Sequence, residues 1–167
     1  MIRPARAQDA AALADINLRG WLLAYEGFVD RAVMLEAGGL LEERFRALGD
    51  PADPRRVLVA EATDGGVRGF VSVGPSRDDD APADVGELHA IYVDPEAVGT
   101  GTGHALLIRG EETLRALGFV AATLWVFERN ARARRFYERH GWTVEPGSGP
   151  GPWGWARSVR YRRELGA

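Results

Sequence analysis

A glycine-rich segment in the middle of the chain constrains its fold more than any other feature. Residues 98–103 read Val-Gly-Thr-Gly-Thr-Gly, between an apolar run that ends at Val93 and an amphipathic stretch that begins at about Thr102. The order predicts a strand, a tight loop and a helix. Glycines let a backbone approach an anion closely, and the N-terminus of a helix attracts negative charge. We therefore expect this loop to bind a ligand that carries phosphate groups.

Two common classes of phosphate-binding loop do not fit the segment. A P-loop requires a lysine after its last glycine, and the chain contains no lysine. A dinucleotide fingerprint has the pattern G-x-G-x-x-G, whereas this loop reads G-x-G-x-G and continues with His104. ATP or GTP on a P-loop is excluded, and NAD is disfavoured. The glycines alone also fit a connection that binds nothing. Whether the loop binds a phosphate ligand therefore has to be judged from other segments of the chain.

Two blocks in fixed order resemble the GNAT superfamily of acyl-CoA-dependent N-acyltransferases. The first block, residues 91–103, is similar to the strand, turn and Q/R-x-x-G-x-G/A loop of that family. The second runs from Asn130 to Trp142 and is similar to its asparagine, alanine, Phe-Tyr and Gly-aromatic pattern. Val98 departs from the family, which usually has glutamine or arginine there. The departure concerns one phosphate contact and leaves the backbone of the loop intact.

Composition fits a single enzyme domain over residues 1–167. A chain of 167 residues with 46% hydrophobic residues can bury one core. The formal net charge of −3 gives no general attraction to nucleic acid or to an anionic membrane. The absence of cysteine excludes disulfides, thiolate metal sites and a cysteine nucleophile. No segment reads as a membrane span or a signal peptide, so we expect a cytoplasmic protein.

Helical and strand patterns alternate along the chain. Strands are expected at residues 2–4, 57–61, 67–73, 87–93, 120–126, 142–144 and 155–163. Helices are expected from the capping residue Asp9 to about 23, over 30–48 with a break at Gly38-Gly39, over 102–117 and over 130–140. These elements predict an α/β (α+β) fold whose mixed, largely antiparallel sheet has about seven strands flanked by helices. The resemblance implies that two central strands splay apart and admit the pantetheine arm of the cofactor.

The resemblance implies acetyl-CoA as cosubstrate and no metal. Its pyrophosphate is expected on the loop residues Val98, Gly99, Thr100, Gly101, Thr102 and Gly103. The backbones of Ile91 and Val93 are expected to bind pantetheine like an added strand and to supply an N–H for the oxyanion. Asn130 is expected to hydrogen-bond the same arm, and it also fits a helix N-cap. Arg134 and Arg135 are either phosphate contacts or ordinary surface charges.

Acyl transfer to an amine requires a base, an acid and an oxyanion donor. The resemblance assigns the base to Glu87, whose alternative interpretation is an exposed edge carboxylate or a carboxylate paired with an arginine. His89 lies on the same strand face and could relay the proton, although a tolerated polar residue is the simpler interpretation. Tyr137 is the expected acid, because the matching tyrosine in the family often lies near the thioester sulfur. Its alternative interpretation is packing beside Phe136.

The acceptor site is expected to include Trp21, Tyr25 and Glu26, with Phe28 and Trp153 nearby. Residues 21–27 resemble a W-x-x-A-Y-x-G pattern found in the superfamily, although core packing explains Trp21 and Tyr25 equally well. The sequence thus predicts an N-acetyltransferase that acts by direct attack on a primary amine of a small molecule or peptide, with a homodimer left open. One alternative is a non-catalytic acyl-CoA-binding or regulatory domain. Another is a nucleic-acid-binding domain, which the net negative charge of the chain disfavours.

Overall fold

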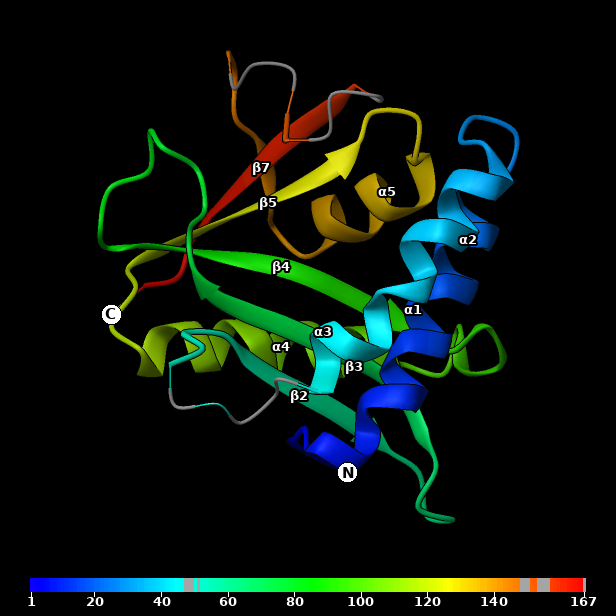
Figure 1. Ribbon diagram of the computed structural model, residues 1–167. Helices are drawn as coiled ribbons and strands as arrows, with labels where there is room; N and C mark the ends of the chain where they lie inside the picture. The colour runs from blue at the N-terminus through cyan, green and yellow to red at the C-terminus, as the bar shows by residue number, and fades with distance from the viewer. Residues whose placement is uncertain (47–49, 51, 148–150, 153–156, 167) are drawn as a thin grey trace.

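A seven-stranded sheet forms the centre of the computed structural model, which describes residues 1–46, 50, 52–147, 151–152 and 157–166 (Figure 1). The spatial order of the strands is β1-β2-β3-β4-β5-β7-β6. The strands are β1 (Ile2–Pro4), β2 (Arg56–Glu61), β3 (Val67–Pro75), β4 (Val85–Val93), β5 (Ala121–Phe127), β6 (Thr143–Val144) and β7 (Ser158–Glu164). The described strand pairs are antiparallel except β4 with β5, which is parallel. The mixed, largely antiparallel sheet predicted from the sequence is confirmed.

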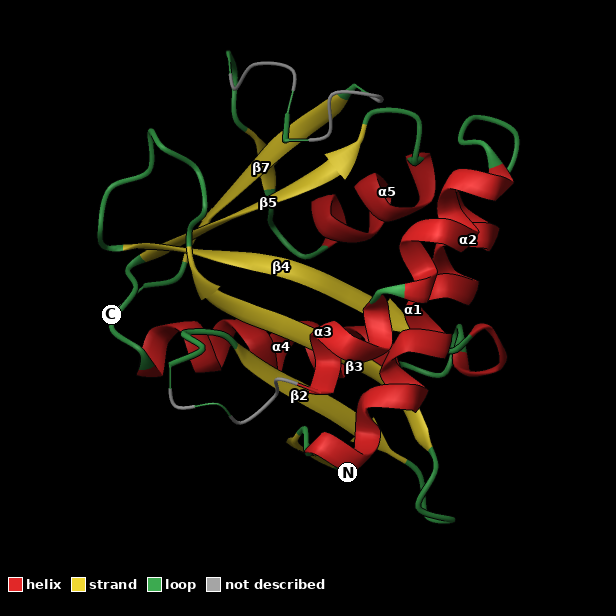
Figure 2. Ribbon diagram, viewed as in Figure 1, coloured by secondary structure: helices red, strands yellow, loops and turns green. Residues whose placement is uncertain are grey.

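Helices cover both faces of the sheet (Figure 2). They are α1 (Ala10–Tyr25), α2 (Arg31–Gly39), α3 (Leu41–Arg46), α4 (Thr102–Ala116) and α5 (Ala131–Arg139), with the short 3-10 helices η1 (Ala7–Asp9) and η2 (Pro95–Ala97). The expected division into two shorter helices is confirmed, although Gly38 and Gly39 are the last two residues of α2 and the break itself lies at Leu40. No helix among the described residues is long and apolar enough to cross a membrane.

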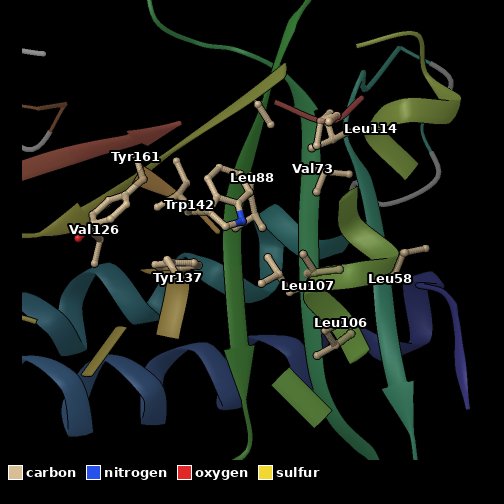
Figure 3. Packing of buried hydrophobic residues seen from close by; sticks show 14 of the residues in the cluster. Leu58, Val73, Leu88, Leu106, Leu107, Leu114, Val126, Tyr137, Trp142 and Tyr161 are labelled. Atoms are coloured by element: carbon tan, nitrogen blue, oxygen red, sulfur yellow. The ribbon is translucent and has the colours of Figure 1, made fainter. Parts of the chain in front are cut away.

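Two hydrophobic clusters hold these layers together. One cluster packs α1 and α3 on the first face of the sheet and includes Leu13, Phe45 and Phe70. The other packs α4 and α5 on the opposite face, where Leu106 and Leu107 of α4 meet strand residues such as Val73 and Leu88 (Figure 3). Successive strand residues point to opposite faces, so Val59 joins the first cluster while Leu58 joins the second.

Strands β4 and β5 diverge soon after they meet. Their pairing covers only Val85–Glu87 of β4 and Ala121–Thr123 of β5. Immediately afterwards His89 is an extra residue in β4, because Leu88 and Ala90 pair with the consecutive residues Val73 and Ser72 of β3. Such a bulge bends a strand, and β4 then runs away from β5 (Figure 1). The splayed central strands implied by the resemblance are confirmed; we call the point of divergence, at Glu87 and Thr123, the fork.

One local prediction is corrected by the structure. Asp9 stands immediately before α1, yet its side chain makes no cap hydrogen bond to that helix. Instead its carboxylate accepts a hydrogen bond from the backbone N–H of Arg6 at 2.7 Å and pairs with the guanidinium of Arg3 at 2.8 Å. The Arg3 hydrogen bond lowers the pKa of Asp9. A charged partner and the preceding 3-10 turn therefore compete successfully for the oxygens of this residue.

Candidate active site

A cavity of about 1020 Å³ extends along the gap between β4 and β5. Its wall includes the loop that precedes α4 at one end and side chains near the fork at the other. The described part of the chain contributes no Asp or Glu side chain to this wall. All three histidines of the chain and five arginines line it: His89, His104, His140, Arg55, Arg77, Arg129, Arg132 and Arg139.

The loop over residues 98–103 presents backbone N–H groups at the first end of the cavity. Gly101 adopts a left-handed φ of 85° and directly precedes α4. The first N–H bonded inside the helix is that of Ala105, which donates to the carbonyl of Gly101 at 3.0 Å. The preceding N–H groups of the first turn therefore remain available to an anion. Val98, Gly99, Gly101 and Gly103 line the cavity, whereas the Thr100 and Thr102 hydroxyls bond to each other at 2.8 Å.

The strand before this loop offers a second row of backbone groups. The N–H of Asp94 donates to the carbonyl of Arg68 on β3 at 2.9 Å. In an antiparallel pair, alternate residues exchange hydrogen bonds, so Tyr92 also bonds toward β3. Ile91 and Val93 consequently direct their N–H and C=O groups to the other side, into the gap left by β5. Both residues line the cavity, as expected for a pantetheine-binding edge.

Tyr137 lies on the cavity wall with its side chain largely buried. It belongs to α5, and Figure 3 shows its ring in the cluster that contains Trp142 and Tyr161. Its hydroxyl has no hydrogen-bond partner in the described part of the chain. Burial raises the pKa of Tyr137, and the nearby Tyr92 phenol adds to the effect. The residue is therefore a neutral phenol whose donor is free to meet a ligand.

Asn130 begins the same helix. Its side-chain Oδ1 accepts a hydrogen bond from the N–H of Ala133 at 3.1 Å, which is an N-cap. The residue also lines the cavity. The cap leaves the Nδ2 donor for a ligand, so the two roles expected from the sequence are compatible.

Glu87 lies at the fork but not on the cavity wall. Only 1% of the residue is exposed. Its carboxylate accepts hydrogen bonds from the backbone N–H of Arg77 at 2.9 Å and from the guanidinium of the same residue at 2.5 Å. The arginine-paired carboxylate named as the alternative interpretation is thus what the structure contains. A base in this position needs another group to reach the amine.

His89 lies between Glu87 and the cavity. Its Nε2 is 3.0 Å from the carbonyl oxygen of Pro75, which can only accept, so Nε2 carries the proton. Nδ1 is then an acceptor, and it is buried without a hydrogen-bond partner in the described structure. Burial lowers the pKa of His89, while the charge of Glu87, 3.8 Å away, opposes that shift. His89 is the bulge residue of β4, a geometry that strand alternation alone does not predict.

The acceptor residues expected from the sequence are only partly brought together. Trp21 lines the cavity and donates its Nε1–H to the hydroxyl of Tyr92 at 2.7 Å. Tyr25 also lines it and packs edge-on against Phe127 with ring centroids 4.5 Å apart. Glu26 is exposed and does not belong to the wall. Trp153 lies outside the described residues.

Helix α5 also places cavity residues that the sequence interpretation missed. Arg134 donates to the hydroxyl of Tyr161 at 3.0 Å, and neither it nor Arg135 lines the cavity. Arg132, Phe136 and Arg139 do. These three residues recur at helical spacing on one face, so periodicity within the second block would have found them.

A pair of histidines lies at the end of the cavity next to the loop over residues 98–103. Nδ1 of His104 lies 2.8 Å from Nε2 of His140, and Nδ1 of His140 lies 2.6 Å from the carbonyl oxygen of Phe136. The carbonyl fixes the proton of His140 on Nδ1, so His104 donates to its neighbour. The described residues contain no group of three or more His, Asp or Glu side chains that could hold a metal ion.

Comparisons with known proteins are consistent with this geometry. A family model described as "Acetyltransferase (GNAT) family" matches residues 19–142. The uncharacterized N-acetyltransferase YuaI of Bacillus subtilis is 32% identical over 129 residues, which cover 77% of this chain and 72% of that protein. A mycothiol acetyltransferase of Propionibacterium freudenreichii is 37% identical over 65% of this chain but only 35% of its own length. The crystal structure of the PaiA N-acetyltransferase from Thermoplasma acidophilum with coenzyme A has the same fold, with a TM-score of 0.81, 20% identity and 98% of each chain covered.

Proposed function

The chain belongs to the GNAT acetyltransferase family, and we propose that residues 1–167 form one catalytic domain that transfers an acetyl group from acetyl-CoA to a primary amine of a small molecule or peptide. The observation that carries the proposal is the cavity between the splayed strands. Its wall combines free backbone N–H groups and a free phenol with the ring of His89, whose Nδ1 is buried and has no hydrogen-bond partner in the described structure. These are the groups that direct acyl transfer requires.

The residues present fit acetyl-CoA. A Cβ on Gly103 would lie 3.5 Å from Val93 and 3.8 Å from Phe136, so a side chain there would fill the space between β4 and α5. The loop and the first turn of α4 would hold the pyrophosphate, and Ile91 and Val93 would pair with the amide groups of the pantetheine arm. Arg132 and Arg139 stand on the wall beside α4 as further partners for phosphate.

The chemistry then divides among the wall residues. When bound, acetyl-CoA supplies a thioester carbon that accepts the lone pair of the amine, with formation of a C–N bond and departure of the thiolate. A backbone N–H on the free edge of β4 stabilises the developing oxyanion. Nδ1 of His89 accepts the amine proton, and the carboxylate of Glu87 stabilises the imidazolium that results. Glu87 thereby supports the base instead of reaching the amine itself.

Tyr137 serves the leaving group, which is the thiolate of CoA. Its raised pKa keeps the phenol protonated at physiological pH. A free thiol ionises near ~8.5, so complete transfer of the phenolic proton to the departing sulfur is uphill. Tyr137 therefore acts first as a hydrogen-bond donor to the thiolate. Trp21 and Tyr25 would enclose the acceptor from α1, and Glu26 at the end of that helix would meet only its outer part.

Two measurements test this function. Calorimetric titration with acetyl-CoA, with ATP as a control that also carries phosphates, reports binding. Release of free CoA thiol over a panel of amines reports catalysis. Acetyl-CoA should bind and ATP should not, and thiol release should depend on an added amine. Absence of acetyl-CoA binding would refute the proposal, and binding without amine-dependent release would favour the non-catalytic alternative.

A further inference from the structure

The charges on the cavity wall select among possible acceptors. A polyamine or another purely cationic amine is usually held by carboxylates, yet the described wall contains none. Five of its eight basic side chains come from α4, α5 and the residues that flank α5 on either side, where the cofactor phosphates would lie. The remaining three, Arg55, Arg77 and His89, come from segments at the fork, beyond the phosphate loop.

These three residues form one cluster. An added Cβ on Gly74 would lie 3.1 Å from Cε1 of His89 and 3.4 Å from Cα of Arg55, so both residues pack over this glycine. Arg77 binds the carboxylate of Glu87, which is 3.8 Å from the His89 ring. The positive charges of Arg77 and Arg55 also contribute to the lowered pKa of His89. Both guanidiniums therefore lie within electrostatic range of the His89 imidazole.

Each guanidinium retains hydrogen-bond donors for a ligand. Arg55 uses Nε and Nη2 on the carboxylate of Asp53, at 2.9 and 2.6 Å. Arg77 uses Nε and Nη2 on Glu87, at 3.2 and 2.5 Å. Neither Nη1 has a hydrogen-bond partner among the described residues. Asp53 and Glu87 do not line the cavity, so the described wall carries guanidinium groups at this place without a carboxylate.

The loop that carries Arg77 is held in place from the other side of the fork. Its next residue, Asp78, accepts the Nε1–H of Trp125 on β5 at 2.9 Å and a hydrogen bond from Arg160 on β7 at 3.1 Å. Arg160 also pairs with Asp80 at 2.7 Å. These contacts anchor the connection between β3 and β4, so the position of Arg77 is fixed before a ligand arrives.

Resting on the proposed acetyl transfer, we infer that the acceptor is an amine that also carries a carboxylate, as an amino acid does. The carboxylate binds the free Nη1 groups of Arg55 and Arg77, which places the amine beside the ring of His89. The two oxygens of a carboxylate accept hydrogen bonds from the planar guanidinium groups of arginines. A cation at the same place would lose water without gaining an acidic partner. The cluster thus sets acceptor specificity next to the residue that receives the proton.

Matched pairs of acceptors test the inference. Each protein amino acid is compared with the amine that lacks only its α-carboxylate, for example phenylalanine with phenethylamine, and spermidine represents purely cationic amines. We expect kcat/KM for at least one amino acid to exceed that of its decarboxylated partner tenfold or more. Preference for the decarboxylated amines or for spermidine would overturn the inference, as would a lack of activity with every amino acid.

Variants then assign the preference to the cluster. Asp53→Asn/Arg55→Gln removes the donors without leaving a buried carboxylate unpaired. It should lower kcat/KM for the preferred amino acid at least tenfold and change that for the decarboxylated partner less than twofold. Arg56→Gln is the matched control, because Arg56 is an exposed neighbour that does not line the cavity. Equal losses on both members of a pair would contradict the assignment.

The inference and the proposed function can fail separately. Calorimetric binding of acetyl-CoA does not depend on Arg55, because that residue lies away from the phosphate loop. Normal acetyl-CoA binding with a preference for cationic amines would overturn only the acceptor assignment. Loss of acetyl-CoA binding in the unmodified protein would remove the function on which the assignment rests.

Discussion

Replacement of Gly101 by alanine separates the role of the loop in binding from its role in folding. Gly101 adopts a φ of 85° at the start of α4. Gly65, in the hairpin between β2 and β3, has a φ of 84°. A Cβ at either position meets nothing within 4 Å. The two glycines therefore match in backbone conformation and in free space, and only Gly101 lines the cavity.

The cost to stability should be the same at both positions. A left-handed conformation costs an L-residue about 1–2 kcal/mol. For a chain of this length each kcal/mol lowers Tm by about 2–4 °C. Gly65→Ala and Gly101→Ala should therefore both lower Tm by about 2–8 °C, and the difference between them should be small.

The cost to acetyl-CoA binding should differ. The methyl group of Gly101→Ala would stand where the pyrophosphate approaches the loop. Hydrogen bonds to charged groups contribute about 1.5–3 kcal/mol each. Loss of one such bond corresponds to about 10- to 150-fold weaker binding. Gly65→Ala should bind acetyl-CoA as the unmodified protein does.

Thermal denaturation and calorimetric titration measure the two effects independently. Equal loss of Tm with loss of affinity confined to Gly101→Ala is the expected result. Unchanged affinity in Gly101→Ala would refute the assignment of the loop as a phosphate site. Weaker binding in both variants would show that general destabilisation, not the loop, controls the affinity.

Three further predictions concern individual residues. Val98→Arg should tighten acetyl-CoA by about 1 kcal/mol through one added charge-assisted bond after its costs, whereas weaker binding in a titration would mean that the valine packs under the loop. Tyr137→Phe should lower kcat by about ten- to a thousandfold with little change in acetyl-CoA affinity, and a normal kcat in steady-state assays would return the residue to a packing role. The neutral imidazole of His89 is the active form, so kcat/KM should fall as pH falls through a pKa below the usual value of about 6.5. Because the charge of Glu87 raises the pKa of His89, Glu87→Gln should move this acidic limb to lower pH. Disappearance of the limb would instead make Glu87 the base.

Local features of the sequence account for most of the secondary structure and for the glycine-rich loop over residues 98–103. Gly101 and Thr102 mark the start of α4, Asn130 caps α5, and Gly38-Gly39 ends α2 shortly before α3 begins. Each feature acts within a few residues, through φ, a cap or an N–H without a partner. A strand-loop-helix order and a cap can be recognised without knowledge of the rest of the chain.

The chemistry at the fork depends on segments that are distant in sequence. The family resemblance predicts Glu87 as a base, but the sequence does not reveal that Arg77 pairs with it, because that pairing depends on how the connection between β3 and β4 folds back. Strand alternation does not reveal the bulge at His89, which arises from the register with β3. Arg55 joins the same cluster because its backbone packs over Gly74 of β3.

The sequence by itself thus determined the order of helices and strands, the loop and the family resemblance, since these follow from short-range backbone preferences and spacing. The tertiary structure decided which groups line the cavity: it left Glu26 outside, buried Glu87 behind Arg77, and placed basic side chains at both ends. Charge and burial at a site are sums over all the segments that meet there. They become defined only when the sheet register and the helix packing bring those segments together.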